Sequence, residues 1–504
     1  MQGSTDKRLA RVLEYALLAI SGLYVLAYMA VAVRRMGYPF EVEWVEGGSL
    51  DQIRRLAAGQ GLYVRPSPNY VPFVYAPLYY YLSAAAAKVI GVSFAPLRLV
   101  SFLASLGSLA VICLLVRRET GSWKAGALSA GLFAATYGLA GASFDMARVD
   151  MWFTFAALLV VYAVRWANTW WSYGGAGLLL AVALLSKQTA LGTSAPLALY
   201  ALYKSRRYGA LLVLGAVVPV VIVSLILDHS SGGWYSYFVF RLPQQHGLNH
   251  SLLFSIWRSE LLAPLPVACV LGGLFVLGVL SSLGRERWLF YALASACMIG
   301  GGYLARAALG SGKNAWLPAY AMLAILFGLG MHQALGLVRT ALPDKRAALE
   351  VCFLALGLAQ FLILAYNPAS RVPGPRDWAA GQALVERIRQ MPGEVLIPFH
   401  GYLASLAGKG SSPQWVGLGE LYGAFGGHET PEGSALREEF RQAIREQRYS
   451  AILLDRNWWL CQEEIDRYYV RRGPVFAPGE QPLWTVPGER LWPNWIYVPR
   501  EPAR

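Results

Sequence analysis

Charged residues in apolar surroundings are the features of this sequence that could carry chemistry. Three acids, Glu41, Glu43 and Glu46, precede a stretch that is predicted to form a short amphipathic helix. The partial positive charge at a helix N-terminus favours an ionised carboxylate. Glu46, with Glu43 in reserve, is therefore a candidate general base that would take a proton from an attacking hydroxyl. The alternative is that these acids only cap the helix or pair with Arg54 and Arg55.

Basic residues in apolar runs could bind an anion. Lys187 interrupts the apolar run 174–203, where a lysine facing lipid is costly, so we expect it to face a watery cavity. Phosphate contact is its natural role, with Gln188 beside it. Snorkelling to the membrane surface is the alternative. Arg306 and Lys313 flank a Gly-rich turn whose backbone N–H groups could face a phosphate, although an ordinary solvated turn has the same composition.

Further acids and one tyrosine are expected near the same cavity. Arg148 and Asp150 lie at the predicted outer end of an apolar span, where charges are usually paired or functional. They form either a substrate-binding element or a structural pair that fixes the helix. Asp145 and Tyr75 are additional candidates for the acceptor or cavity.

Histidines and cysteines do not indicate a metal centre. His246 and His250 are four residues apart, but Pro243 and Gly247 around them favour a loop, and we see no third ligand. We interpret both as substrate-loop residues and expect no metal and no cofactor. The five cysteines form no C-x-x-C pair, which argues against a metal site and a disulfide framework. His400, beside a predicted strand end, is interpreted as structural.

The composition indicates an integral membrane protein. Of 504 residues, 56% are hydrophobic and only 15% are charged, and the mean hydropathy is positive. The net charge of +14 is concentrated in short loops, where it orients helices by the positive-inside effect. Nucleic-acid binding is therefore a poor explanation of the basic charge. Lys7, Arg8 and Arg11 before the first span place the N-terminus in the cytoplasm, and we expect that span to be a retained anchor.

About eleven spans are expected, the first near 12–33 and the last near 347–366. An outer loop, 36–95, would carry two interfacial helices. The first would run from Ser49 to about Ala58, with a capping box formed by Ser49 and Gln52, and the second from Leu78 to Ile90. We divide the chain into a transmembrane catalytic domain, 1–366, and an extracytoplasmic α/β domain, 367–504. That second domain is expected to contain a helix at 376–391, a strand at 394–399, a helix at 434–447 and a strand at 451–455. A tail rich in Pro and Trp would follow them.

The order of motifs in the outer loop resembles a known superfamily. The motifs are Glu46-Gly47, Gly59, Leu62-Tyr63 and the run Pro77 to Tyr81. This pattern is similar to the GT-C superfamily of polytopic glycosyltransferases, such as the protein O-mannosyltransferases and the lipid A aminoarabinose transferases. Arg-x-Asp at 148–150 and Lys-Gln at 187–188 resemble the same proteins. Many of them carry an Asp-Glu pair where this chain has Val45-Glu46, so either Glu46 or Glu43 could be the base.

The resemblance implies a GT-C-like helical membrane protein that moves a sugar from a polyprenyl-phosphate-linked donor to a hydroxyl acceptor. The acceptor would be a lipid, a glycan or a protein, on the outer face of a prokaryotic inner membrane. The implied reaction is metal-independent and uses an acid as general base. A transporter or flippase of a glycolipid is the alternative, and a non-catalytic assembly protein is a third. Many transporters carry paired broken helices, whereas only one apolar run is interrupted here.

Overall fold

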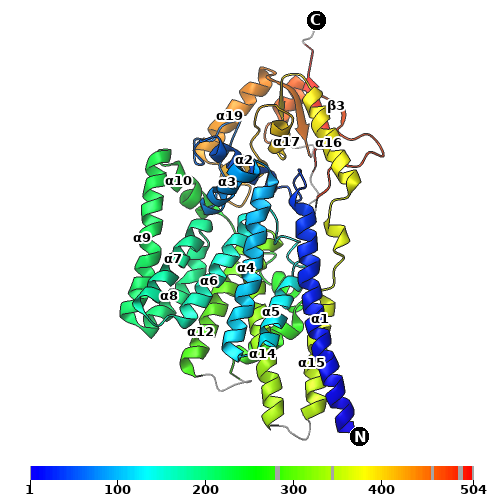
Figure 1. Cartoon of the computed structure of the whole chain (residues 1–504). Helices are drawn as coiled ribbons and strands as arrows, with labels where there is room; N and C mark the ends of the chain where they lie inside the picture. Colours follow the sequence, from blue (N-terminus) through cyan, green and yellow to red (C-terminus); the bar gives the residue numbers. More distant parts are fainter. Residues whose placement is uncertain (1, 279–283, 342–345, 456–458, 486–491, 502–504) are drawn as a thin grey trace.

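A computed structural model describes residues 2–278, 284–341, 346–455, 459–485 and 492–501. A bundle of long helices bears a small mixed domain at one end, and the N-terminus lies at the other end (Figure 1). Helices α1 and α15 lie side by side at one edge of the bundle, and α9 lies at the opposite edge. The bundle helices are α1 (Gln2–Met36), α4 (Phe94–Thr120), α5 (Trp123–Ala135), α6 (Val149–Trp166), α7 (Trp170–Ser186), α8 (Ala190–Lys204), α9 (Arg206–Ser231), α11 (Pro266–Val276), α12 (Arg285–Ser295), η4 (Ala296–Gly300), α13 (Gly301–Ala307), α14 (Leu317–Ala341) and α15 (Arg346–Ile363).

Seven helices in the described ranges are long and apolar enough to cross a membrane. The expected spans each correspond to a helix, but four of those helices, α5, α7, α8 and α11, have only 13, 17, 15 and 11 residues. A complete crossing takes about 20 residues. Between α5 and α6, and between α7 and α8, the backbone is irregular. Irregular backbone at membrane depth is tolerated where it is buried in protein or lines a cavity, and both breaks carry predicted site residues.

The first loop contains the two expected helices, α2 (Glu46–Ala57) and α3 (Leu78–Ile90). The predicted capping box is wrong, because α2 begins at Glu46, so Ser49 already lies inside the helix. Helix α3, which we expected to be interfacial, buries Tyr79 and Tyr80 and exposes Tyr81. Tyr79 is fully buried and its hydroxyl donates a hydrogen bond to the carbonyl of Leu97, 3.0 Å away. The loop is thus packed between the bundle and the C-terminal domain (Figure 1).

Short helical segments complete the loops of the bundle. They are α10 (Trp234–Ser236), η1 (Tyr237–Arg241), η2 (Leu242–Gln245), η3 (Trp257–Leu262) and η5 (Lys313–Trp316). The loop around Gly247 contacts the C-terminal domain directly, since the N–H of Gly247 donates a hydrogen bond to the carbonyl of Phe425 at 2.9 Å.

The C-terminal domain is built on a four-stranded sheet with the order β1-β2-β4-β3. Strands β1 and β2 are parallel, and the other two pairs are antiparallel. The elements are η7 (Ala369–Arg371), α16 (Pro375–Gln390), β1 (Glu394–Leu396), α17 (Gly401–Leu406), α18 (Trp415–Leu421), α19 (Pro431–Arg445), β2 (Tyr449–Leu454), α20 (Gln462–Tyr468), β3 (Tyr469–Pro474) and β4 (Trp495–Pro499). The two strands in the tail, β3 and β4, were not predicted, because β3 is mostly exposed and lacks a buried alternating face.

Candidate active site

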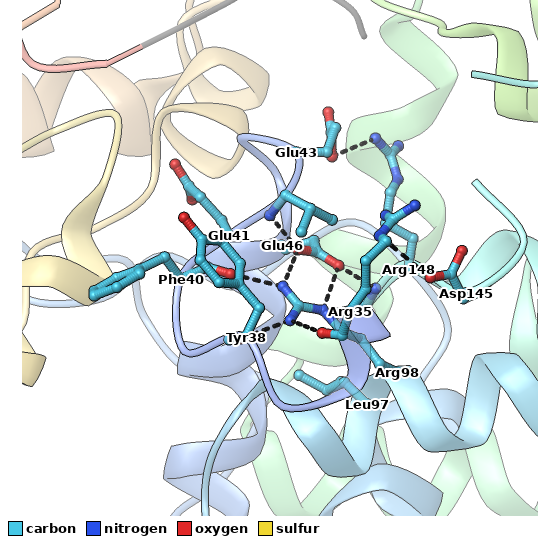
Figure 2. Close-up of polar contacts among 12 residues, drawn as sticks. Arg35, Tyr38, Phe40, Glu41, Glu43, Glu46, Leu97, Arg98, Asp145 and Arg148 are labelled. Carbon is cyan, nitrogen blue, oxygen red and sulfur yellow. Dashed lines mark hydrogen bonds and ion pairs between the residues drawn. The ribbon is translucent and has the colours of Figure 1, made fainter. Parts of the chain in front are cut away.

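Glu46 is fully buried and its carboxylate is saturated with donors (Figure 2). Arg98 donates to it through Nη2, 2.7 Å from Oε2, and through Nε, 3.3 Å from Oε1. The backbone N–H groups of Val42 and Ala147 donate to the same two oxygens, at 2.7 and 2.6 Å. Burial alone would raise the pKa of Glu46, but Arg98 and the backbone donors outweigh burial and lower it. This carboxylate has the surroundings of a structural ion pair.

Arg98 also fixes the path of the first loop. Its guanidinium donates to the carbonyls of Arg35, Tyr38 and Phe40, at 3.0, 2.6 and 2.7 Å (Figure 2). A planar guanidinium with five donors suits this role, since three carbonyls and one carboxylate converge on it. We did not single out Arg98 from the sequence. The available signal was a charge inside an otherwise apolar span.

Asp145 belongs to a second buried ion pair beside the first. Its Oδ2 lies 3.3 Å from Nε of Arg35, and Tyr137 donates to its Oδ1 at 2.9 Å. Burial raises the pKa of Asp145 despite the opposing effect of Arg35. The structure therefore places this predicted cavity residue in an internal contact between α1 and the loop that follows α5.

Glu43 has different surroundings from Glu46. Its side chain is 13% exposed, and Oε2 accepts hydrogen bonds from Nη1 of Arg148 at 3.1 Å and from the N–H of Val45 at 3.2 Å. Within the described part of the chain, no donor to its Oε1 is recorded. Burial raises the pKa of Glu43, against the lowering effect of Arg148. A carboxylate with one open oxygen and a raised pKa can accept a proton.

An alternating chain of charges leads from Glu43 into the bundle. Arg148 lies between two acids, since its Nε is 3.3 Å from Oδ2 of Asp150. The other oxygen of Asp150 pairs with Nζ of Lys187 at 2.6 Å. A hydrogen bond joins Asp150 also to the side chain of Asn314. The structure thus brings together four residues that the sequence singled out, from three separate segments.

A small cavity adjoins the inner end of this chain of charges. Its lining comes from α6, α13, α14, η5 and the break between α7 and α8, and comprises Asp150, Phe153, Lys187, Thr189, Gly301, Gly302, Ala305, Asn314, Ala315 and Pro318. Two charged side chains and several small residues therefore face one space. The volume of about 10 Å³ has room for about one water molecule, so a phosphate could enter only if the cavity widened.

Comparisons with known proteins give the same fold. The family model of the dolichyl-phosphate-mannose-protein mannosyltransferases matches residues 72–228. The crystal structure of ArnT from Cupriavidus metallidurans bound to undecaprenyl phosphate superposes with a TM-score of 0.58 at 12% identity, covering 94% of this chain and 97% of that one. The chain therefore shares its fold with that structure over nearly the whole of its length.

Two further structures share this fold. The apo state of the same ArnT gives a TM-score of 0.59 at 13% identity, with 94% and 97% of the two chains covered. The Archaeoglobus fulgidus oligosaccharyltransferase in complex with Zn and sulfate gives 0.52 at 13% identity, with 91% of this chain and 72% of that one covered. No curated protein matches the sequence significantly. The expected fold class, a GT-C-like helical membrane protein with a small C-terminal domain, is confirmed.

Gln188 and Tyr75 both lie beside Lys187. The Gln188 side chain donates to the carbonyl of Val74 at 2.6 Å, which ties the α7–α8 break to the first loop. The Tyr75 ring centroid is 5.9 Å from Nζ of Lys187. These three candidate residues therefore lie together in space.

Arg306 is engaged elsewhere. Its Nε and Nη2 donate to the two oxygens of Glu260 at 2.9 and 2.8 Å, and Trp316 donates to the same carboxylate at 2.7 Å. An incoming phosphate would have to displace this bidentate pair. Lys313 is exposed and immediately precedes Asn314, which contacts Asp150. Lys313 is thus better placed than Arg306 to meet an anion at the cavity.

His246 and His250 do not act as a pair. His246 Nε2 lies 2.5 Å from Oε2 of Glu420, a residue of α18 in the C-terminal domain, whereas His250 is exposed. Burial lowers the pKa of His246, but the contact with Glu420 outweighs it and raises the pKa. Across the described ranges, no group of three His, Cys, Asp or Glu residues could hold a metal ion. Glu420 was missed in the sequence, since nothing local marks it.

His400 forms a buried contact between the two domains. Its Nδ1 pairs with Glu41 of the first loop, and its Nε2 lies 2.8 Å from Oδ2 of Asp455. Burial would lower the pKa of His400, but the two carboxylates raise it to about 10. His400 is therefore a buried cation between two acids.

Proposed function

We propose that the protein is an integral membrane glycosyltransferase that moves a sugar from a polyprenyl-phosphate-linked donor to a hydroxyl acceptor. The observation that carries the proposal is the chain of charges from Glu43 through Arg148 and Asp150 to Lys187. It offers a carboxylate with an open oxygen at one end and a cation beside a cavity at the other. A GT-C fold supports this assignment.

Glu43 is assigned as the general base. The acceptor hydroxyl must lose a proton as it attacks the anomeric carbon, and the receiving carboxylate must be reachable. Glu43 is partly exposed and its raised pKa makes it the stronger base. Glu46 is sealed by four donors, and its lowered pKa makes it a weaker base. We therefore assign Glu46 to the structure of the loop.

Lys187 and Arg148 are assigned to the donor phosphate. As the bond to the sugar breaks, negative charge grows on the leaving phosphate, and preorganised cations stabilise it. Both cations are already placed by Asp150, which holds them on either side of its carboxylate. Lys313 is the remaining candidate, since it is exposed and adjoins Asn314. No step in this scheme uses a metal ion.

The outer face of a prokaryotic inner membrane is the proposed location. The basic loops at 117–118, 206–207 and 285–287 join helices at the end of the bundle that bears the N-terminus. The positive-inside effect assigns that end to the cytoplasm. The C-terminal domain, the first loop and Glu43 then lie outside, where a lipid-linked sugar and an acceptor could meet.

The test is incubation of the purified protein with a panel of polyprenyl-phosphate sugars and candidate hydroxyl acceptors. We expect one donor to be consumed with release of polyprenyl phosphate, and we expect turnover to persist with a metal chelator. If no donor is consumed and a glycolipid instead moves across the membrane of proteoliposomes, the glycosyltransferase proposal is rejected in favour of the flippase alternative. Turnover that is abolished by chelation and restored by a metal would reject the metal-independent mechanism.

A further inference from the structure

Gln414 of the C-terminal domain contacts the backbone right beside Glu43. Its amide nitrogen donates to the carbonyl of Trp44 at 2.6 Å and to the carbonyl of Phe399 at 3.1 Å. Its amide oxygen accepts the N–H of Val416 at 2.7 Å. The side chain is only 3% exposed. Each polar atom of this buried amide is therefore used, and one of the bonds crosses from the C-terminal domain to the loop that bears Glu43.

The same part of the C-terminal domain contacts the loop at two more points. The N–H of Glu41 donates to the hydroxyl of Tyr402 at 3.3 Å, and its carboxylate pairs with His400. The Tyr402 ring packs on Gly47, where an added Cβ would lie 2.4 Å from Cδ1 of that ring. The glycine of the Glu-Gly motif is thus required by the close approach of the C-terminal domain.

These contacts matter because the segment around Glu43 lacks regular secondary structure. Residues 41–45 lie between α1 and α2, so side chains from elsewhere determine where the Glu43 carboxylate points. Arg98 binds the carbonyls before this segment, at Arg35, Tyr38 and Phe40. Gln414 binds the carbonyl directly after Glu43. The segment is therefore held from the bundle on one side and from the C-terminal domain on the other.

We propose that Gln414 is a positioning residue that orients Glu43 for transfer, so that the C-terminal domain completes the active site. The catalytic part of this inference rests on the proposed function. The structural part, that Gln414 fixes residues 41–46, does not depend on it. A misplacement of about 1 Å in a reacting group can reduce a rate by about a hundredfold, so a single hydrogen bond beside the base can control turnover.

Gln414→Glu is the test variant because it keeps the shape of the side chain. The carboxylate has no donor, so an oxygen would face the carbonyls of Trp44 and Phe399, which repel it. Gln442→Glu on α19 is the matched control, since Gln442 is exposed and, among the described residues, its amide donates only to Glu446, at 2.8 Å. We expect kcat to fall about ten- to a hundredfold in Gln414→Glu, with the donor KM unchanged, and neither to change in Gln442→Glu.

Hydrogen exchange gives a readout that does not depend on turnover. We expect the amides of residues 41–49 to exchange faster in Gln414→Glu than in the native chain, while those of β2 at 449–454 stay protected. Unchanged exchange at 41–49, or an equal loss of kcat in the control, would overturn the proposal. If the native protein consumes no donor, the proposed function fails, and the exchange result alone still decides whether Gln414 fixes the loop. If Gln414→Glu does not fold, Gln414→Asn, which shortens the amide by one methylene, takes its place.

Discussion

Glu43 and Glu46 are three residues apart in the chain, yet they pair with different arginines. Glu46 binds Arg98 of α4 and is fully buried, whereas Glu43 binds Arg148 at the start of α6 and keeps one oxygen without a recorded donor among the described residues. The division follows from the position of α2, which begins at Glu46 and directs that side chain into the bundle. One acid is thereby held in a buried ion pair, and the other keeps an oxygen that could accept a proton.

Exchange of each acid for its amide should separate these roles. Glu43→Gln should reduce transfer by a factor of roughly a hundred to ten thousand, with donor binding retained, because the base is lost. Glu46→Gln should instead destabilise the fold by about 3–5 kcal/mol, because Arg98 is left as a buried charge without its partner. Initial rates and thermal unfolding of both variants provide the measurement. A stable but inactive Glu46→Gln beside an active Glu43→Gln would reverse the assignment.

Lys187 should control donor affinity. Lys187→Ala removes a charge-assisted contact to phosphate and should raise the donor Kd by roughly ten- to a hundredfold. Lys204→Ala is the matched control, since Lys204 pairs with Glu286 at the other end of α8. Binding of a polyprenyl phosphate to the purified variants, measured calorimetrically, gives the comparison. Equal donor affinities in the two variants would show that Lys187 does not contact the phosphate.

The contact between His400, Glu41 and Asp455 should make stability depend on pH. The pKa of His400 is raised from 6.5 to about 10 in the folded protein, so the folded state binds this proton more tightly than the unfolded state. Its contribution is therefore complete below pH 6.5 and is lost as the pH rises through about 10. Above that pH, Glu41 and Asp455 remain buried without a cation.

Thermal unfolding between pH 6.5 and 10 measures this effect. We expect the Tm of the native chain to fall across the range and the Tm of His400→Gln to fall less steeply from a lower starting value. His428, which is mostly exposed, offers the control His428→Gln. A native Tm that stays constant over this range would show that His400 does not carry the buried charge.

The orientation of the chain can be tested with a reporter. A reporter fused after Tyr422, at the end of α18, should behave as extracytoplasmic, and one fused near the N-terminus should behave as cytoplasmic. The N-terminus and the C-terminal domain lie at opposite ends of the bundle, which requires this difference (Figure 1). If the reporter after Tyr422 behaved as cytoplasmic, Glu43 and Lys187 would have to be assigned to the inner face of the membrane.

The sequence by itself determined the elements whose signals are local. The polytopic helical fold follows from long apolar runs, and α3 has the expected bounds, Leu78 to Ile90. The parallel strands of the C-terminal domain and its helices α16 and α19 follow from their hydrophobic periodicity. The candidates Glu43, Arg148, Asp150 and Lys187 were also recognisable, because a charge inside or beside an apolar run is costly and needs a reason.

The tertiary structure alone decided which of these charges pair. Arg98 reaches Glu46 from 52 residues away, and Gln414 reaches Trp44 from 370 residues away. It also decided that four spans are short and that β3 and β4 close the sheet. The reason is physical. Periodicity and capping report on neighbours in the chain, whereas the partner of a buried charge depends on which segments approach one another once the helices have packed.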